Sequence, residues 1–151
     1  SGNTDFTTEG ILDTTTTLGG AEAGAFDQAI TKTDPAMVMM SLATYQSIDP
    51  NNPAVFSSTI IDGHIRNALK YTGVVISDSM SAEALSSYDV SQLGVKLVEA
   101  GGDMSCIGQT DYVKPIVDGL NERAKSDPAF ASKVTAAATR VMTLKIKMGL
   151  A

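Results

Sequence analysis

Three short apolar runs, each followed by a stretch with helical spacing, constrain the fold of this chain more than any other feature. The runs are "AMVMMSL" at 36–42, "VVIS" at 74–77 and "DMSCI" at 103–107. The first is continuously apolar rather than alternating, which is typical of a parallel strand covered on both faces. A spacing of roughly 30 to 37 residues between the runs fits repeated βα units. The sequence therefore predicts an α/β protein with a parallel sheet.

Apolar residues recur at intervals of three and four between and after these runs, as on the buried face of an amphipathic helix. Residues 1–20 are rich in Thr, Gly and Asp and are predicted to form a loop. The predicted helices are 21–32, 57 or 58 to 70, 90–100 (ended by Gly101 and Gly102), 112–125, and a last one along a seam of Phe130, Val134, Ala137, Val141, Leu144 and Met148.

The composition excludes several classes of protein. With 43% hydrophobic and 19% charged residues the chain resembles an ordinary globular domain, and no apolar run approaches the roughly 20 residues of a membrane span. A formal charge of -6, with Lys and Arg scattered, offers phosphate backbones no attractive face, so nucleic acid is not an expected partner. Cys106 and His64 are each the only residue of their kind, which leaves no internal disulfide and no conventional zinc site.

Repeated βα units build either a doubly wound sheet or part of a (β/α)8 barrel. A nucleotide-binding sheet carries a glycine-rich turn after its first strand, and neither GxGxxG nor GxxxxGK[ST] follows Leu42, Ser77 or Ile107. Barrel enzymes place reacting groups at the carboxyl ends of their strands, and Asp78 stands directly after "GVVIS". The residues thus favour a barrel segment without a cofactor. The alternative role for Asp78 is to cap the turn or helix that follows.

Other conspicuous side chains receive structural interpretations. Met37, Met39 and Met40 are expected to fill the core. Cys106, on a strand expected to be buried, is interpreted as a small hydrophobic residue rather than a nucleophile. Asp103 is expected to cap or pair at the entrance of its strand.

Four motifs in a fixed order give the chain a family resemblance: "MVMMSLATY", "IDPNNPAVFS", "GVVISDSM" and "AGGD". Together they resemble the last three βα units of glycoside hydrolase family 3, which contains β-N-acetylhexosaminidases and β-glucosidases. The opening "GNTDFTTEG" is similar to the loop after the fifth barrel strand of actinobacterial-type members. The resemblance implies a half-barrel, with residues 1–20 as the loop after a missing fifth strand and residues 21–151 as the C-terminal βα units.

The resemblance also implies a reaction. In the family, the acid of the "SD" pair is the nucleophile of a retaining glycosidase; this acid is Asp78 here, and Ser79, Met80 and Ser81 are candidate contacts to the sugar. Such an enzyme needs one ionised carboxylate to attack the anomeric carbon and a proton donor roughly 5 Å away. The implied reaction is cleavage of terminal β-linked N-acetylglucosamine or glucose through a covalent glycosyl-enzyme.

The expected proton donor departs from the family pattern. Hexosaminidases of the family use an Asp-His pair in the loop after strand five, whereas His64 lies in a predicted helix and is interpreted as a surface or half-buried residue. By approximate alignment, Thr7 and Glu9 fall near the two positions of that pair. Glu9 or Asp5 is the candidate acid/base if burial raises its pKa, and the alternative is that both are solvated loop acids.

Much of the barrel is expected to be missing. Family members carry strands one to five before this segment, including a Lys-His pair and an Arg and an Asp that bind the sugar. Three strands alone leave two open edges and an apolar inner face, so we expect the missing half of the barrel or a second copy of the chain to cover them. The alternative function is an inactive carbohydrate-binding or structural half-barrel that self-associates. The resemblance implies an extracellular or cell-envelope location.

Overall fold

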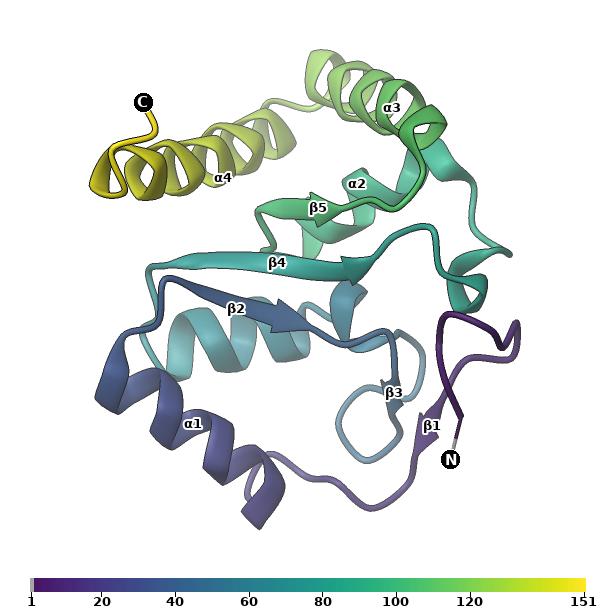
Figure 1. The fold of residues 1–151 in the computed structure, drawn as a ribbon, viewed down its shortest axis with the longest axis vertical. Helices are drawn as coiled ribbons and strands as arrows, with labels where there is room; N and C mark the ends of the chain where they lie inside the picture. The colour runs from purple at the N-terminus through teal and green to yellow at the C-terminus, as the bar shows by residue number, and fades with distance from the viewer. Residues whose placement is uncertain (1) are drawn as a thin grey trace.

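The structure, a computed structural model, describes residues 2–151 and has the expected α/β architecture. Its centre is a three-stranded parallel sheet in the order β2-β4-β5, formed by β2 (Met37–Met40), β4 (Val74–Ser79) and β5 (Met104–Cys106). Figure 1 shows the three strands running in one direction, with their carboxyl ends on the side where the N-terminal segment lies. The prediction of three parallel strands from three apolar runs is confirmed.

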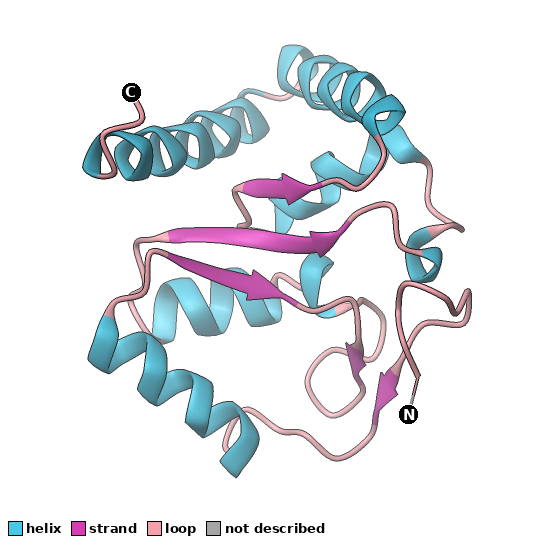
Figure 2. Cartoon of the chain, in the orientation of Figure 1, coloured by secondary structure: helices cyan, strands magenta, loops and turns pink. Residues whose placement is uncertain are grey.

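The helices fall close to the predicted ranges (Figure 2). Helix α2 begins and ends at the predicted residues, and Gly101 caps it with a φ of 103°, which favours glycine. Helix η2 is wound as a π-helix, in which the Gly63 N–H donates to the Ser58 C=O at 2.9 Å. The bounds are α1 (Ala21–Thr33), η1 (Ala54–Phe56), η2 (Thr59–Ala68), η3 (Glu83–Leu85), α2 (Val90–Ala100), η4 (Thr110–Tyr112), α3 (Val113–Ser126) and α4 (Pro128–Lys147).

One face of the sheet packs against η2 and α2 and forms the core. Val75 of β4, Ile61 of η2 and Leu97 of α2 are almost fully buried in one cluster. Figure 1 shows both helices behind the strands. Burial of each such side chain contributes about 1.5–3 kcal/mol. This packing fixes the middle strand relative to the helices.

The last two helices extend the cover beyond β5. Phe130 of α4 is buried against Val95 and Val98 of α2. The apolar seam predicted along α4 is buried at Phe130 and Ala137, whereas Met148 at its end is exposed. The seam therefore packs against the rest of the chain only in the first part of α4.

The opposite face of the sheet is largely uncovered. Met39 is 63% exposed, and Met37 and Cys106 are exposed as well. The predictions that both methionines fill the core and that Cys106 lies buried are therefore wrong, whereas Met40 is buried as expected. Successive side chains of a strand point to opposite faces, and Met37 and Met39 lie on the face opposite that of Val75, which packs against η2 and α2.

Two short strands tie the N-terminal segment to the carboxyl end of the sheet. Strand β1 (Leu12–Asp13) pairs in parallel with β3 (Thr44–Tyr45), which follows β2. Nearer the N-terminus, the Ala84 N–H donates to the Thr4 C=O at 3.0 Å. Apart from β1, residues 2–20 form turns and loops, as predicted; Ser1 lies outside the described residues. The segment thus lies beside the end at which the strands finish (Figure 1).

A buried charge cluster holds the other end of the sheet. The carboxylate of Asp103, at the entrance of β5, pairs with Arg66 of η2 at 2.5 Å and with Arg140 of α4 at 2.7 Å. It also accepts a hydrogen bond from the Val75 N–H at 2.8 Å. The prediction that Asp103 pairs at the strand entrance is confirmed. The cluster joins two helices to the sheet near the amino ends of its strands.

Candidate active site

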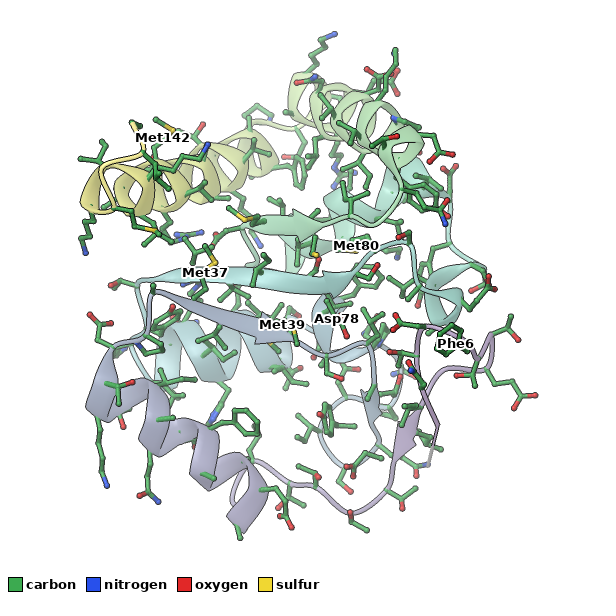
Figure 3. The ribbon with its side chains drawn as sticks, in the orientation of Figure 1. Phe6, Met37, Met39, Asp78, Met80 and Met142 are labelled. Carbon is green, nitrogen blue, oxygen red and sulfur yellow. The ribbon has the colours of Figure 1, made fainter. Side chains whose placement is uncertain are left out.

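Asp78 lies at the carboxyl end of β4, the middle strand of the sheet (Figure 3). The sequence predicts a strand that ends at Ser77, but β4 continues to Ser79, so Asp78 belongs to the strand. The pairing extends further because the Met80 N–H donates to the Cys106 C=O at 2.8 Å. The carboxylate is therefore carried by a paired strand end, which holds it more firmly than a free loop would.

The Asp78 side chain is half-buried and makes one local contact. Its Oδ1 accepts a hydrogen bond from the Ser79 N–H at 2.7 Å, and its Oδ2 makes no hydrogen bond within residues 2–151. The next helix, η3, has Ala82 at its N-cap and no side-chain cap. Asp78 therefore does not cap that helix, which removes this form of the capping alternative. One carboxylate oxygen is left without a protein partner among the described residues.

The three residues after Asp78 differ in what they expose. The hydroxyls of Ser79 and Ser81 are half-buried and lie 3.1 Å apart, and Ser81 Oγ also accepts from the Gly108 N–H at 3.1 Å. Met80 is only 1% exposed and belongs to the core. The Met80 side chain therefore has almost no free surface to offer a sugar, whereas both serines lie near the surface.

The two candidate proton donors lie in the N-terminal segment. Asp5 and Glu9 are both exposed, and the Asp5 C=O accepts from the Glu83 N–H at 3.4 Å. The segment is thereby attached to η3, directly downstream of Asp78. Among the described residues neither acid has the apolar surroundings that a proton donor needs.

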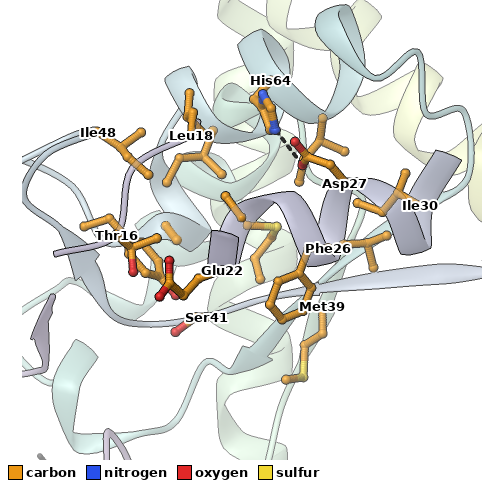
Figure 4. A pocket seen from close by; sticks show the side chains of 17 residues that line it. Thr16, Leu18, Glu22, Phe26, Asp27, Ile30, Met39, Ser41, Ile48 and His64 are labelled. Atoms are coloured by element: carbon orange, nitrogen blue, oxygen red, sulfur yellow. Dashed lines mark hydrogen bonds and ion pairs between the residues drawn. The ribbon is translucent and has the colours of Figure 1, made fainter. Parts of the chain in front are cut away.

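His64 is half-buried, as interpreted from the sequence, but it has a partner that the sequence did not reveal. Its Nε2 lies 2.8 Å from Asp27 Oδ1, so the pair joins η2 to α1 (Figure 4). Both residues line a hollow of about 210 Å³ between α1, β2 and η2, together with apolar side chains such as Phe26 and Ile30. Asp78 does not line this hollow. His64 thus acts in helix packing rather than beside the candidate nucleophile.

The described residues offer neither a metal site nor a membrane span. Within residues 2–151 no group of three or more His, Cys, Asp and Glu side chains is arranged to hold a metal ion. No helix in the same range has the length and apolar character needed to cross a bilayer.

A carboxylate at the carboxyl end of a parallel strand is the arrangement with which α/β enzymes present a reacting group. The fold and the site therefore define this chain as part of an α/β enzyme. The family model described as "Glycosyl hydrolase family 3 N terminal domain" matches residues 4–144. The chain belongs to glycosyl hydrolase family 3, and the resemblance inferred from its motifs is confirmed.

Solved structures and a curated protein are similar to the chain. A β-N-acetylhexosaminidase from Beutenbergia cavernae has 35% sequence identity and a TM-score of 0.87 over 95% of this chain and 43% of its own. A glycoside hydrolase family 3 β-N-acetylglucosaminidase from Paenibacillus has 26% identity and a TM-score of 0.81 over 93% of this chain and 27% of its own. An uncharacterized secreted glycosyl hydrolase from Arthroderma benhamiae is 36% identical over 69 residues, 45% of this chain and 20% of that protein. The chain spans less than half the length of each.

Proposed function

We propose that the protein is a retaining glycoside hydrolase that removes terminal β-linked N-acetylglucosamine or glucose, with Asp78 as its nucleophile. The observation that carries this proposal is the half-buried carboxylate at the carboxyl end of the middle strand. The two solved structures described above are named for N-acetylhexosamine and N-acetylglucosamine, which favours the acetylated sugar as substrate.

The contacts of Asp78 suit an attacking group. The Ser79 N–H holds Oδ1 at 2.7 Å, and Oδ2, without a hydrogen bond within residues 2–151, is the oxygen that attacks the anomeric carbon. As the C1–Oδ2 bond forms, the glycosidic bond breaks and the leaving oxygen takes a proton from a second acid. Water then attacks C1, the same second group removes its proton, and the Asp78 carboxylate is released.

The second acid is proposed to come from the N-terminal segment. Glu9 or Asp5 is the candidate, because the segment that carries both is attached to η3, which follows Asp78 in the chain. Their present exposure means that bound sugar, or further polypeptide, has to supply the apolar surroundings of a proton donor.

We propose further that the sheet forms the last three βα units of a (β/α)8 barrel, with residues 2–20 as the loop after the fifth strand. The exposed methionines Met37 and Met39 and the two edge strands β2 and β5 support this arrangement, since a closed barrel covers such a face and pairs such edges. The remainder of the barrel is the proposed partner, and a second copy of the chain is the alternative. Sedimentation distinguishes them, because only the second makes a homodimer.

Labelling of the nucleophile tests the proposed function. A 5-fluoroglycoside of N-acetylglucosamine, which keeps the acetamido group, should form a long-lived ester with Asp78, found by mass spectrometry of the peptide that contains it. Asp78→Asn should lower the release of nitrophenol from the β-N-acetylglucosaminide by a factor of about 10⁴ or more. Asp111→Asn, at an exposed acid of η4, is the matched control and should retain the activity. A label on another residue contradicts the proposal, and sugar binding without turnover supports the inactive alternative.

A separate experiment tests the second acid. Glu9→Gln and Asp5→Asn should differ in their effects. The variant that removes the proton donor should lose activity on substrates with poor leaving groups. Azide should restore turnover of that variant, with a β-glycosyl azide as the product. If azide rescues neither variant, both residues are solvated loop acids and the donor lies elsewhere.

A further inference from the structure

The ladder between β4 and β5 shifts by one residue beside Asp78. Ser77 and Asp78 together stand opposite a single residue of β5, Ser105. Such a bulge re-aims the side chain that it carries, and bulges are enriched next to active sites. The register pairs on either side of the shift are Ile76 with Met104 and Ser79 with Cys106.

The side chain of Ser77 holds this bulge from within. Ser77 is 1% exposed, and its hydroxyl accepts a hydrogen bond from the Cys106 N–H at 2.9 Å. On the other side of Asp78, the Met80 N–H donates to the Cys106 C=O at 2.8 Å. Both polar groups of the Cys106 backbone are therefore bound by residues of β4 or its extension that bracket Asp78.

We propose that Ser77 is a positioning residue for Asp78, an inference that rests on the proposed role of Asp78 as nucleophile. Without the hydroxyl, the Cys106 N–H loses a buried acceptor and the strand is free to relax toward one-to-one pairing. A shift of one residue sends each side chain beyond it to the opposite face of the sheet. The Ser77 hydroxyl thus keeps the carboxylate turned toward the position at which the sugar's C1 binds.

The expected kinetic effect follows from misplacement rather than from lost sugar contacts. Displacement of a reacting group by about 1 Å lowers the rate by up to about 100-fold. Ser77→Ala should therefore lower kcat about 10- to 100-fold with KM changed by less than about threefold, because Ser77 is buried and contacts no sugar. Ser77→Thr, which keeps the acceptor oxygen, should recover most of the rate.

The experiment uses the natural protein that contains these residues and counts active sites with the fluoroglycoside, so that kcat is expressed per labelled Asp78. Ser105→Ala is the matched control: Ser105 faces the same bulge from β5, and its hydroxyl makes no hydrogen bond among the described residues. Amide hydrogen exchange at Cys106 should be faster by at least about tenfold in Ser77→Ala and unchanged in Ser105→Ala.

Failure of the inference is distinguishable from failure of the proposed function. If the fluoroglycoside does not label Asp78 in the wild-type protein, the proposed function fails and the inference fails with it. If Asp78 is labelled but Ser77→Ala keeps the wild-type kcat per labelled site, the positioning role is overturned. It is also overturned if the Cys106 amide exchanges its hydrogen as slowly in Ser77→Ala as in the wild type. If Ser77→Thr is as slow as Ser77→Ala, the loss of rate comes from altered packing rather than from the missing hydroxyl, and the positioning role is again overturned.

Discussion

Replacement of Asp103 tests how much a buried carboxylate shared by two arginines contributes to this fold. The side chain of Asp103 is 0% exposed, and those of Arg66 and Arg140 are 12% and 28% exposed. Burial lowers the pKa of the Arg66 guanidinium, and the negative charge of Asp103 acts in the opposite direction. The carboxylate therefore compensates a charge that is poorly hydrated.

The magnitude follows from what each arginine keeps when the carboxylate is removed. Arg66 still donates to the Gly73 C=O at 2.7 Å and to the Tyr71 C=O at 3.1 Å, but its charge has no partner. Arg140 is exposed enough to turn toward water. Removal of one side of a buried pair costs about 3–5 kcal/mol. At about 2–4 °C per kcal/mol for a chain of this size, Asp103→Ala should lower Tm by about 6–20 °C.

Thermal and urea unfolding followed by circular dichroism measure the effect. Asp103→Asn keeps the shape and an acceptor for the Val75 N–H, so its loss should be smaller than that of Asp103→Ala, and Arg140→Met should lose less than either. Asp111→Asn, an exposed acid, is the control and should be neutral within about 0.5 kcal/mol. A loss below about 1 kcal/mol in Asp103→Ala, typical of an exposed pair, would refute the reasoning.

Three other predictions concern single groups. Burial raises the pKa of Asp49, but hydrogen bonds from its neighbours, above all from Ser57, outweigh burial and hold the pKa below its usual value. Because the pKa is lower in the folded than in the unfolded protein, Asp49 stabilises the fold fully above about pH 5, and this stabilisation is lost as the pH falls through the folded pKa. Asp49→Asn should therefore make the free energy of unfolding depend less on pH in the acid range. Burial raises the pKa of Tyr71 to about 12, so ultraviolet titration should show a phenol that ionises near pH 12 and is absent in Tyr71→Phe. A Cβ on Gly119 would lie 1.9 Å from a backbone oxygen of α2, so Gly119→Ala should destabilise the protein by about 1–3 kcal/mol or more. A Cβ on Gly24 in α1 would have no neighbour within 4 Å, so Gly24→Ala should stabilise the protein by about 0.5–1 kcal/mol. Equal effects of the two substitutions in urea unfolding would contradict this packing argument.

Local patterns in the sequence were sufficient to predict the order and the approximate bounds of the elements. Leu93 and Leu97 fall at helical spacing and indicate the helix, and Gly101 marks its C-terminal end. The position of Asp78 at the end of a strand was likewise predicted from the residues next to it in the chain. Both predictions depend on residues that are close neighbours in the chain, where side-chain period and turn chemistry act directly.

Features that depend on distant neighbours could not be predicted. Arg66 and Arg140 each lie 37 residues from Asp103, and no spacing rule selects them among the other basic residues. The exposure of Met39 depends on what covers the second face of the sheet, which an apolar run does not specify. The bulge at Ser77 arises from register with another strand, so that a serine in a strand gave no signal of its role.

The attachment of the N-terminal segment has a consequence for engineering. Carbonyls at Thr4 and Asp5 accept from N–H groups of η3, and Ile11 C=O accepts from the Thr44 N–H at 2.8 Å, so main-chain atoms make both attachments. The side chains at positions 6–9 therefore make neither attachment, whereas Gly10, with a φ of 68°, has to be kept. This short stretch is a natural site for loop grafting, in which an Asp-His pair introduced at Thr7 and Glu9 would install a different acid/base system on an unchanged sheet.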